Sequence, residues 1–534
     1  MLRNVTLFIV VILSTVVAHA GDATKRPNIV FAFADDWGRY ASAYAALKSG
    51  TPSDVIKTPH IDRVAKEGVL FTNAFVNAPS CTPCRSSLLS GQYFWRTGMG
   101  AILLGATWDP AIPSYPLMLR DKGYHIGYSY KVWGPGTPAN APYGGSATSY
   151  AKQGGDFNNF SEKVSKEKDI EAGKKKLLAQ VRGNFVDFLA ARPAGQPFCY
   201  WFGPTNVHRK WEKGSGKKLW GIEPDSLKGK LEAGLPDTPE IREDFSDYLG
   251  EAQAFDAGVG ELLAELDARG ELENTMVVIS GDHGVPGLPR GKCNLYDLGA
   301  AVSLMIRWPV KVPAGRVVTD FVSLPDLCPT FLEAAGEKPL PIMTGRSLIP
   351  VLTASTSGRV DPTRDHVIIG RERHVDKTRP GDLPYPQRAI CTDKYLYIRN
   401  FTPERWPLGT APGFGVEGVM PKEELLTENT FVAFADLDAS PAKSYLLHHL
   451  DQPEIAAFVN NWLGQRPAEE LYDASNDPQQ LTNVAGNPEL AAVKKELSDK
   501  LMTILRDSRD PRVVDDPVPY ESKPFASTHP ITGK

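Results

Sequence analysis

The sequence predicts an α/β fold: a doubly wound, mostly parallel sheet flanked by helices, with a smaller C-terminal subdomain built on an antiparallel sheet and a helix. Three observations predict it. Four largely apolar runs have the length of strands, stretches with helical spacing of apolar residues lie between them, and shorter runs follow Pro309. The chain has 534 residues, of which 42% are hydrophobic and 23% are charged, so it can bury a large core.

The four apolar runs form the first part of the predicted sheet. They span residues 28–34, 124–130, 198–204 and 275–281, and polar residues follow each of them. Apolar runs of this length are typical of strands buried on both faces, as parallel strands are. In such sheets ligands bind at the carboxyl ends of the strands, so we expect these polar residues to converge although they lie far apart in sequence.

Helical patterns lie between the runs, and the pattern changes in the last third of the chain. Residues 59–68, 184–191 and 244–270 carry apolar side chains at helical spacing. A further helix is predicted to open at 325–330, and 339–350 is a proline-broken connector. The C-terminal subdomain is predicted from short runs at 367–369, 388–390 and 395–398 and from a helix near 488–506. We therefore predict a larger α/β domain over 21–365, an α+β subdomain over 366–515 and an irregular tail over 516–534.

The N-terminus has the pattern of a secretory signal peptide. Arg3 precedes an almost wholly apolar run over residues 5–17, and Ala18-His19-Ala20 is a small-x-small cleavage pattern. The alternative is a membrane anchor, but the run is short and polar residues follow it at 21–26. We expect cleavage near Ala20, export to the periplasm or beyond, and no membrane anchor in the mature protein.

Charge and cysteine content exclude other classes. The chain has 59 Lys and Arg residues against 63 Asp and Glu, a net charge of −4, which argues against a nucleic-acid-binding surface. Its six cysteines are too few for a disulfide scaffold. Four of them lie far apart and are expected to be buried hydrophobic residues or a single bridge: Cys199, Cys293, Cys328 and Cys391.

Carboxylates gather at two predicted strand ends. Asp35 and Asp36 follow the run at 28–34, and Asp282 follows the run at 275–281. Converging carboxylates repel one another unless a cation neutralises them, and oxygen ligands select a hard ion such as Ca²⁺ or Mg²⁺. The alternative is that the aspartates cap a helix or a turn. Their placement at both strand ends favours the metal site.

A cysteine pair opens a predicted helix within residues 80–91. Pro83 fits the first turn, Cys81 lies at the predicted N-cap, and the helix dipole there is expected to lower the pKa of its thiol. Arg85, one turn on, is placed to hold an anion. Cys81 and Cys84 then have three interpretations: a thioredoxin-like redox pair, half of a zinc site, or a covalent catalyst at Cys81. The zinc site lacks a second Cys-x-x-Cys pair.

The stretch Cys81-x-Pro83-x-Arg85, followed by Leu-Ser-Gly at 89–91, resembles the signature of type I sulfatases, which are formylglycine-dependent members of the alkaline phosphatase superfamily. Other motifs follow in the order of that family over roughly residues 27–310, and 470–478 resembles its closing motif. These motifs are Pro-Asn-Ile-Val at 27–30 before Asp35 and Asp36, Thr-Pro-His-Ile-Asp at 58–62, Lys131, His208, Asp-His-Gly at 282–284, Gly-Lys at 291–292 and Tyr-Asp at 296–297. The redox interpretation is correspondingly less favoured.

The resemblance implies a covalent mechanism. Cys81 would be oxidised to formylglycine (3-oxoalanine) by a formylglycine-generating, or sulfatase-maturating, enzyme, and its hydrate would attack sulfur and later expel sulfate. The implied ligands of Ca²⁺, with Mg²⁺ as the alternative ion, are Asp35, Asp36, residue 81, Asp282 and His283. Asn is commoner in the family at the position of His283.

The resemblance also assigns cationic and acid roles. Arg85, Lys131 and Lys292 would form a positive cage around the transferring sulfuryl group, and His208 would bind sulfate or protonate the leaving group. The family often has His two residues after the catalytic Lys, where this chain has Trp133.

Basic residues in the C-terminal subdomain suggest the substrate. Arg371, Arg373 and His374 are candidates to contact a polyanionic sugar, and the alternative is a solvated loop. This stretch and residues 235–239 resemble the heparan N-sulfatase (sulfamidase) branch, which implies an N-sulfoglucosamine substrate; a sulfate ester on another polysaccharide is the close alternative. A phosphodiesterase or phosphonate hydrolase of the same superfamily, and an inactive protein that binds sulfated glycans, are the rival functions.

Overall fold

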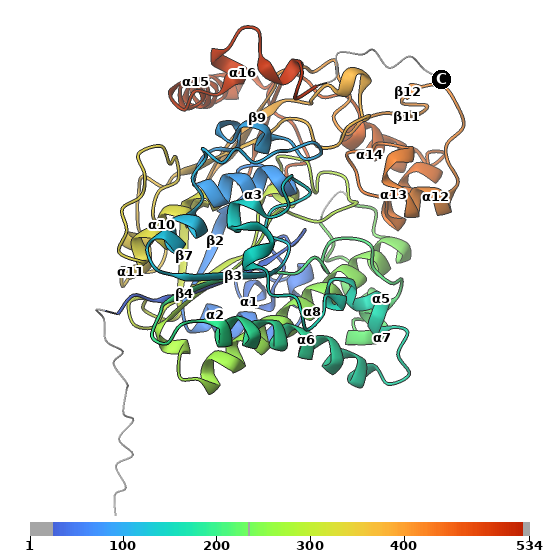
Figure 1. Cartoon of the computed structure of the whole chain (residues 1–534). Coiled ribbons are helices and arrows are strands. Elements are labelled where there is room, and N and C mark those ends of the chain that lie inside the picture. The colour runs from blue at the N-terminus through green and yellow to red at the C-terminus, as the bar shows by residue number, and fades with distance from the viewer. Residues whose placement is uncertain (1–24, 233–234, 527–534) are drawn as a thin grey trace, which may run out of the picture.

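The computed structural model describes residues 25–232 and 235–526. The predicted signal peptide and its cleavage site lie outside the described residues. A β-sheet lies at the centre of the molecule (Figure 1). It has seven strands in the order β3-β4-β1-β5-β6-β2-β7. Its strands are β1 (Asn28–Ala34), β2 (Val69–Phe75), β3 (His125–Tyr130), β4 (Phe198–Gly203), β5 (Thr275–Gly281), β6 (Leu304–Arg307) and β7 (Arg316–Ser323).

The sheet is mostly parallel, as predicted. β1 pairs in parallel with β4 and β5, β3 with β4, and β2 with β7, whereas β6 runs antiparallel to both of its neighbours. The four predicted runs are β1, β3, β4 and β5, and their observed ends lie within one residue of the predicted ends. β2, β6 and β7 are absent from the prediction. In β2, Thr72 and Asn73 interrupt the apolar pattern with half-buried polar side chains.

Both faces of this sheet are buried under helices, which confirms the doubly wound architecture. Along β1, Ile29, Phe31 and Phe33 pack into one core cluster, and the alternate residues Val30 and Ala32 pack into a second. The first cluster includes side chains of α3 (Cys81–Ser90), α4 (Tyr115–Asp121) and α10 (Leu327–Ala334). The second includes α2 (Pro59–Lys66), α6 (Ile170–Ala191) and α8 (Pro239–Ala268), which lie below the sheet in Figure 1. A side-chain period of two therefore supplies both cores from one strand.

The remaining helices of this part are short. They are α1 (Ser42–Ala45), α5 (Phe160–Val164), α7 (Ser215–Trp220), α9 (Asp297–Ala300) and α11 (Ile349–Thr353). α6 and α8 are longer than predicted at their N-terminal ends, where Asp169 and Thr238 cap them by accepting hydrogen bonds from backbone N–H groups. A proline at the first position of α8 fits the same start.

A second, antiparallel sheet carries the C-terminal part of the fold. Its order is β13-β10-β9-β8, with β8 (His366–Arg371), β9 (Gln387–Thr392), β10 (Tyr395–Asn400) and β13 (Glu469–Asp473). One face packs against α15 (Ala491–Asp507) through Leu497, Leu501 and Leu505, and the other face joins the first core cluster of the large sheet. The predicted antiparallel sheet and its helix are therefore confirmed.

Between β10 and β13 lies a helical segment absent from the prediction. It contains the short strands β11 (Ala411–Pro412) and β12 (Gly415–Val416) and the helices α12 (Glu423–Glu428), α13 (Pro441–His448) and α14 (Pro453–Leu463). These helices have their own apolar cluster. After α15, α16 (Pro511–Val514) leads to residues 516–526, which wrap the small sheet and bury Tyr520 in its cluster.

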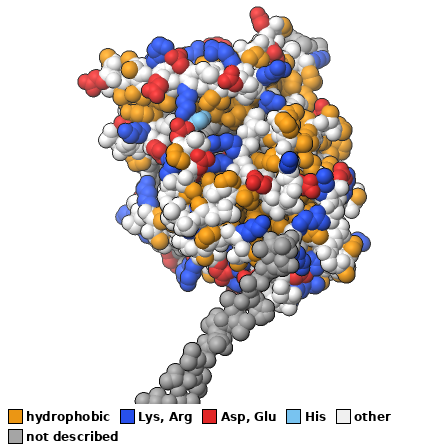
Figure 2. Space-filling view, turned by 90° about the vertical axis from the view of Figure 1, so that its left-hand side faces the viewer, with side chains coloured by type: hydrophobic (Ala, Val, Ile, Leu, Met, Phe, Trp, Pro, Cys, Tyr) orange, Lys and Arg blue, Asp and Glu red, His pale blue; other side chains and the backbone are white. Residues whose placement is uncertain are grey.

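The surface agrees with the nearly balanced charge of the chain. On the face shown in Figure 2, Lys and Arg side chains are interspersed with Asp and Glu. No helix in the described part of the chain has the length and apolar character needed to cross a membrane.

Candidate active site

The site begins where β1 and β5 end side by side. Ala34 pairs with Gly281, so Asp35, Asp36 and Asp282 leave the sheet at one point, as predicted. The backbone N–H of Asp36 donates to the Asp282 carboxylate at 2.7 Å. All three aspartates are buried, and Asp36 has a left-handed φ of 54°. The turn thus holds carboxylates where water cannot stabilise them unaided.

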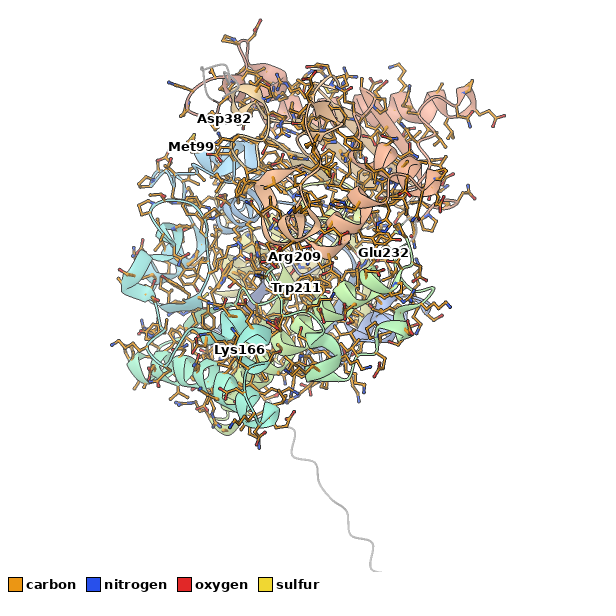
Figure 3. All side chains as sticks on the ribbon, turned by 90° about the vertical axis from the view of Figure 1, so that its right-hand side faces the viewer. Met99, Lys166, Arg209, Trp211, Glu232 and Asp382 are labelled. Carbon is orange, nitrogen blue, oxygen red and sulfur yellow. The ribbon has the colours of Figure 1, made fainter. Side chains whose placement is uncertain are left out.

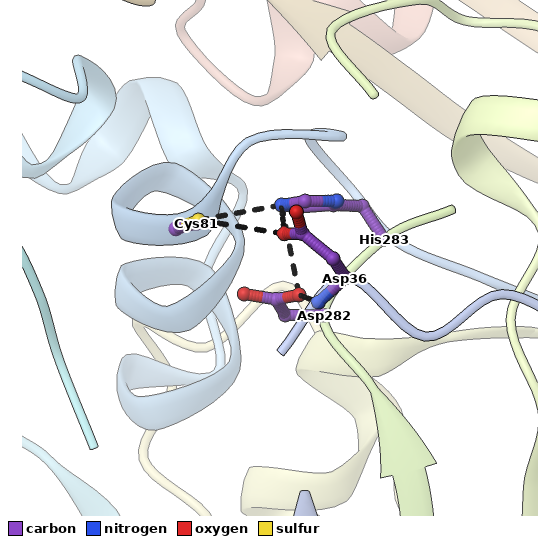
Figure 4. Close-up of side chains that lie close together, drawn as sticks. All are labelled: Asp36, Cys81, Asp282 and His283. Carbon is purple, nitrogen blue, oxygen red and sulfur yellow. Dashed lines mark hydrogen bonds and ion pairs between the residues drawn. The ribbon is translucent and has the colours of Figure 1, made fainter. Parts of the chain in front are cut away.

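Helix α3 directs Cys81 at these carboxylates (Figure 4). The Cys81 Sγ lies 3.4 Å from His283 Nε2 and 4.0 Å from Asp36 Oδ1. Ser80 is the N-cap and Cys81 the first helical residue, so the predicted cap was displaced by one position. The predicted lowering of the thiol pKa is wrong: burial raises the pKa of Cys81, outweighing the opposing effect of Lys131 and Lys292.

Four side chains form a group able to hold a metal ion. Ligand atoms of Asp36, Cys81, Asp282 and His283 all lie within 4.8 Å of one another, and a second such group contains Asp35, Asp36 and His208. His283 Nε2 is 3.2 Å from Asp36 Oδ1 and 3.6 Å from Asp282 Oδ1. Asp35, Asp36 and Asp282 contribute three carboxylates to the two groups, and carboxylate oxygens suit a hard cation such as Ca²⁺ or Mg²⁺. Burial raises the pKa of Asp282.

Cations surround the carboxylates. Arg85 donates to Asp35 at 2.8 Å and to Asp282 at 2.9 Å, and Lys131 Nζ lies 2.7 Å from Asp35 Oδ1. Lys292 Nζ lies 3.0 Å from Asp36 Oδ2. Burial opposes the charged form of each group, but the cations prevail at Asp35 and lower its pKa. The carboxylates in turn raise the pKa values of Lys131 and Lys292 against the opposing effect of burial.

His208 stands at the open edge of this centre. It follows β4, its side chain is 33% exposed, and its Nε2 lies 3.7 Å from Asp36 Oδ2. Lys131 is 18% exposed, whereas Arg85 is fully buried. A group arriving from solvent therefore meets His208 and Lys131, while Arg85 is enclosed by Asp35, Asp282 and the carbonyl oxygens of residues 131 and 132.

Asp438 belongs to the centre and is absent from the sequence prediction. Its Oδ2 lies 3.2 Å from Lys292 Nζ, so Lys292 bridges two carboxylates. Burial raises the pKa of Asp438, but Lys292 and His208 outweigh it, and the net shift is downward. Asp438 follows no predicted strand and lies between α12 and α13; the only signal in the sequence was the pair of acids at 436 and 438.

The predicted substrate residues are largely buried. Arg371 pairs with Asp436 at 2.6 Å, Arg373 donates to the Leu104 carbonyl at 2.6 Å, and His374 Nδ1 lies 2.8 Å from Ser80 Oγ. Burial lowers the pKa of His374 to about 3. Their contact with substrate stays a prediction. Their visible contacts join the end of β8 and the loop after it to Asp436, to Leu104 and to Ser80, the N-cap of α3.

Two other features of the motif have structural explanations. Trp133 is buried, and its indole N–H donates to Ser86 Oγ at 2.7 Å, so it packs against α3. All six cysteines are buried and free, and burial raises the pKa of Cys84. Cys199, Cys293, Cys328 and Cys391 are therefore buried hydrophobic residues, one of their two predicted roles.

Comparison with protein families shows to which family the chain belongs. The model of the sulfatase family matches residues 27–337, more than half of the chain, and spans every residue of the centre except Asp438 and the loop after β8. The chain belongs to the sulfatase family. Its members hydrolyse sulfuric esters, and the expected enzyme class and fold are confirmed.

Relatives of this sulfatase cover most of its length. Human N-sulphoglucosamine sulphohydrolase is 28% identical over 523 residues, covering 92% of this chain and 93% of the relative. An ulvan-active sulfatase of Formosa agariphila is 24% identical over 503 residues, covering 90% and 76%. A solved structure in complex with its substrate D-glucosamine-2-N,6-O-disulfate superposes with a TM-score of 0.59 at 16% identity, covering 91% of this chain and 99% of that one.

Proposed function

We propose that this protein is an exported, metal-dependent sulfatase that removes sulfate, O- or N-linked, from sulfated glycans after Cys81 has been converted to formylglycine. The observation that carries the proposal is the position of the Cys81 Sγ, 3.4 Å from His283 and 4.0 Å from Asp36, at the edge of a buried carboxylate group. Burial raises the pKa of the unmodified Cys81 thiol, which disfavours the nucleophilic thiolate form.

Formylglycine would supply a hydrated aldehyde, with one hydroxyl to attack sulfur and a second through which sulfate is expelled. Ca²⁺, or Mg²⁺, held by Asp35, Asp36, Asp282 and His283, would polarise the sulfate oxygens. The maturating enzyme is a required partner on this proposal. Export follows from the signal-peptide pattern of residues 1–20.

The chain's own cations and histidine would complete the reaction. Lys131 and Lys292 contact different carboxylates, Asp35 and Asp36, and would stabilise charge that develops on the equatorial oxygens. Arg85 would fix the orientation of Asp35 and Asp282, because its donors are already occupied by them. His208, the most exposed of these groups, would protonate the departing oxygen or nitrogen.

The relatives support a glycan as the substrate class. One is named for N-sulfoglucosamine, one acts on ulvan, and the solved complex holds a disulfated glucosamine. We propose a sulfated glucosamine-type sugar, with the N-linked sulfate as the first choice. The coverage of both chains by the human relative favours that choice.

The test is a desulfation assay on N-sulfated glucosamine, O-sulfated glucosamine, an aryl sulfate and the matched aryl phosphate, with protein whose Cys81 state has been measured. Release of sulfate from a sugar, with aryl phosphate turned over far more slowly, is the expected result. Faster hydrolysis of phosphate or phosphonate would support the rival hydrolase. Tight binding of the sugars without turnover by modified protein would support the inactive glycan-binding function.

A further inference from the structure

A cleft of about 650 Å³ opens directly beside the catalytic centre. His208 and Asp438 line it, and they also contact Asp36 and Lys292, so the cleft and the centre share a wall. Figure 3 looks at this side of the molecule, where Arg209 and Trp211 lie between α8 below and the C-terminal helices above. The part of a substrate beyond its sulfated group would enter here.

The lining of this cleft is rich in acid. Eight carboxylates line it: Glu212, Glu240, Glu243, Asp244, Asp247, Glu423, Glu428 and Asp438. The Lys and Arg side chains of the lining are Arg209, Lys210 and Lys213, and each is already paired, with Asp244, Glu428 and Glu243 respectively. No lysine or arginine of this lining is therefore left free to receive an anion.

Three of the carboxylates of the cleft are exposed to solvent. Glu212, Glu240 and Glu423 are exposed, and none has an ion-pair partner among the described residues. Like charges close together in a cleft add to one another, because the protein walls confine the field. A sulfate or carboxylate that entered the cleft would be repelled by this acidic rim.

Other side chains in the cleft suit a sugar. The Tyr445 and His449 rings stack with centroids 4.0 Å apart and both residues line the cleft. Thr427, Thr430 and Ser444 also line the space; the hydroxyls of Thr427 and Ser444 donate to the Glu423 carbonyl, and that of Thr430 accepts from the Ala439 N–H. Aromatic faces with a few polar groups are typical of small-ligand sites.

We infer that this acidic cleft binds a glycosyl residue without anionic groups, next to the sulfated sugar, and selects against substrates that carry a carboxylate or a second sulfate at that position. The inference rests on the proposed function. It makes the cleft a specificity site separate from the sulfate-binding centre, where the cations lie.

The experiment compares two disaccharides that share one sulfated glucosamine, linked either to glucose or to glucuronic acid, with the free sulfated glucosamine as reference. We expect kcat/KM to be roughly five- to tenfold higher for the glucose disaccharide at low salt. About 1 M salt, where the Debye length is about 3 Å, should reduce that preference. The triple variant Glu212→Gln, Glu240→Gln, Glu423→Gln should reduce it too.

A matched triple variant at distant exposed glutamates, Glu333→Gln, Glu489→Gln, Glu496→Gln, should keep the preference of the parent protein. Equal kcat/KM for the two disaccharides, or a higher value for the glucuronic acid one, overturns the inference while the proposed function stands. No desulfation of the free sulfated glucosamine or of an aryl sulfate, by protein shown to carry formylglycine, overturns both.

Discussion

The centre around Cys81 and the cleft beside it manage charge in opposite ways. In the centre, Asp35, Asp36 and Asp282 are buried and each lies within 3.0 Å of a cationic side chain. In the cleft, Glu212, Glu240 and Glu423 are exposed and without ion-pair partners among the described residues. Buried charges cost much free energy unless they are paired, whereas exposed ones cost little.

This difference in charge pairing assigns the two regions different roles: catalysis in the centre and substrate selection in the cleft. The paired centre is expected to be rigid, because removing one partner leaves an uncompensated buried charge. Exposed carboxylates of the cleft can be substituted with little effect on the stability of the protein, because surface carboxylates contribute little to it. Changes to the centre should therefore reduce turnover most, and substitutions at the periphery should reduce it least.

Metal removal should have the largest effect. Dialysis against a chelator should lower the kcat/KM for an aryl sulfate by about 10³-fold or more, because the cation would supply several kcal/mol of transition-state stabilisation. Addition of Ca²⁺ should restore activity, measured as sulfate release. A chelated protein with full activity would contradict the role of Asp35, Asp36, Asp282 and His283 as ligands.

His208→Gln, at the edge of the centre, should lower kcat for a glycosyl sulfate by about 10²-fold or more, because a poor leaving group needs a proton. The loss should be much smaller for an aryl sulfate whose phenolate leaves unaided. Equal losses for the two substrates would show that His208 binds sulfate instead. Steady-state rates on both substrates provide the measurement.

Asp438→Asn, on the wall shared by centre and cleft, should lower kcat by roughly tenfold with little change in KM. Lys292 keeps its contact with Asp36 in this variant but loses its second carboxylate. Asp438→Glu should recover part of the loss. A variant with reduced thermal stability and unchanged kcat would show that Asp438 only supports the fold.

Substitution of Glu251, which lies on α8, should change the stability of the protein and leave its turnover unchanged. It accepts hydrogen bonds from Ser161 N–H and the Asn206 side chain, and burial raises its pKa to about 7 against about 4.3 in an unfolded chain. The folded state binds the Glu251 proton more tightly than the unfolded chain does. The resulting contribution to the free energy of unfolding is therefore complete below about pH 4 and is lost as the pH rises through about 7.

In the parent protein, ionisation of Glu251 should lower the free energy of unfolding by on the order of 2 kcal/mol between about pH 5 and 8. The Glu251→Gln variant should not show this decrease. Denaturant unfolding across that range measures it, with the exposed Glu496→Gln as the control. If parent and variant show the same pH dependence, Glu251 is already ionised in the folded protein.

How well the sequence predicted each region follows from the same physics. Asp35, Asp36 and Asp282 were found because apolar strands buried on both faces have clear ends, and parallel strands bring those ends together. Asp438 was not found from the sequence, because it follows no strand of the sheet. It lies between α12 and α13, whose apolar cluster is separate from the cores of the two sheets. Arg371 looked like a surface residue by its charge; only the structure places Asp436 against it.

The central claim is that residue 81, converted to formylglycine, is the group that attacks sulfur. Mass spectrometry of the Cys81 peptide from the native host should show the aldehyde, and Cys81→Ala should abolish desulfation. Cys84→Ala, in the same helix and equally buried, should retain most of the activity. An unmodified thiol in fully active protein, or an active Cys81→Ala variant, would contradict the account.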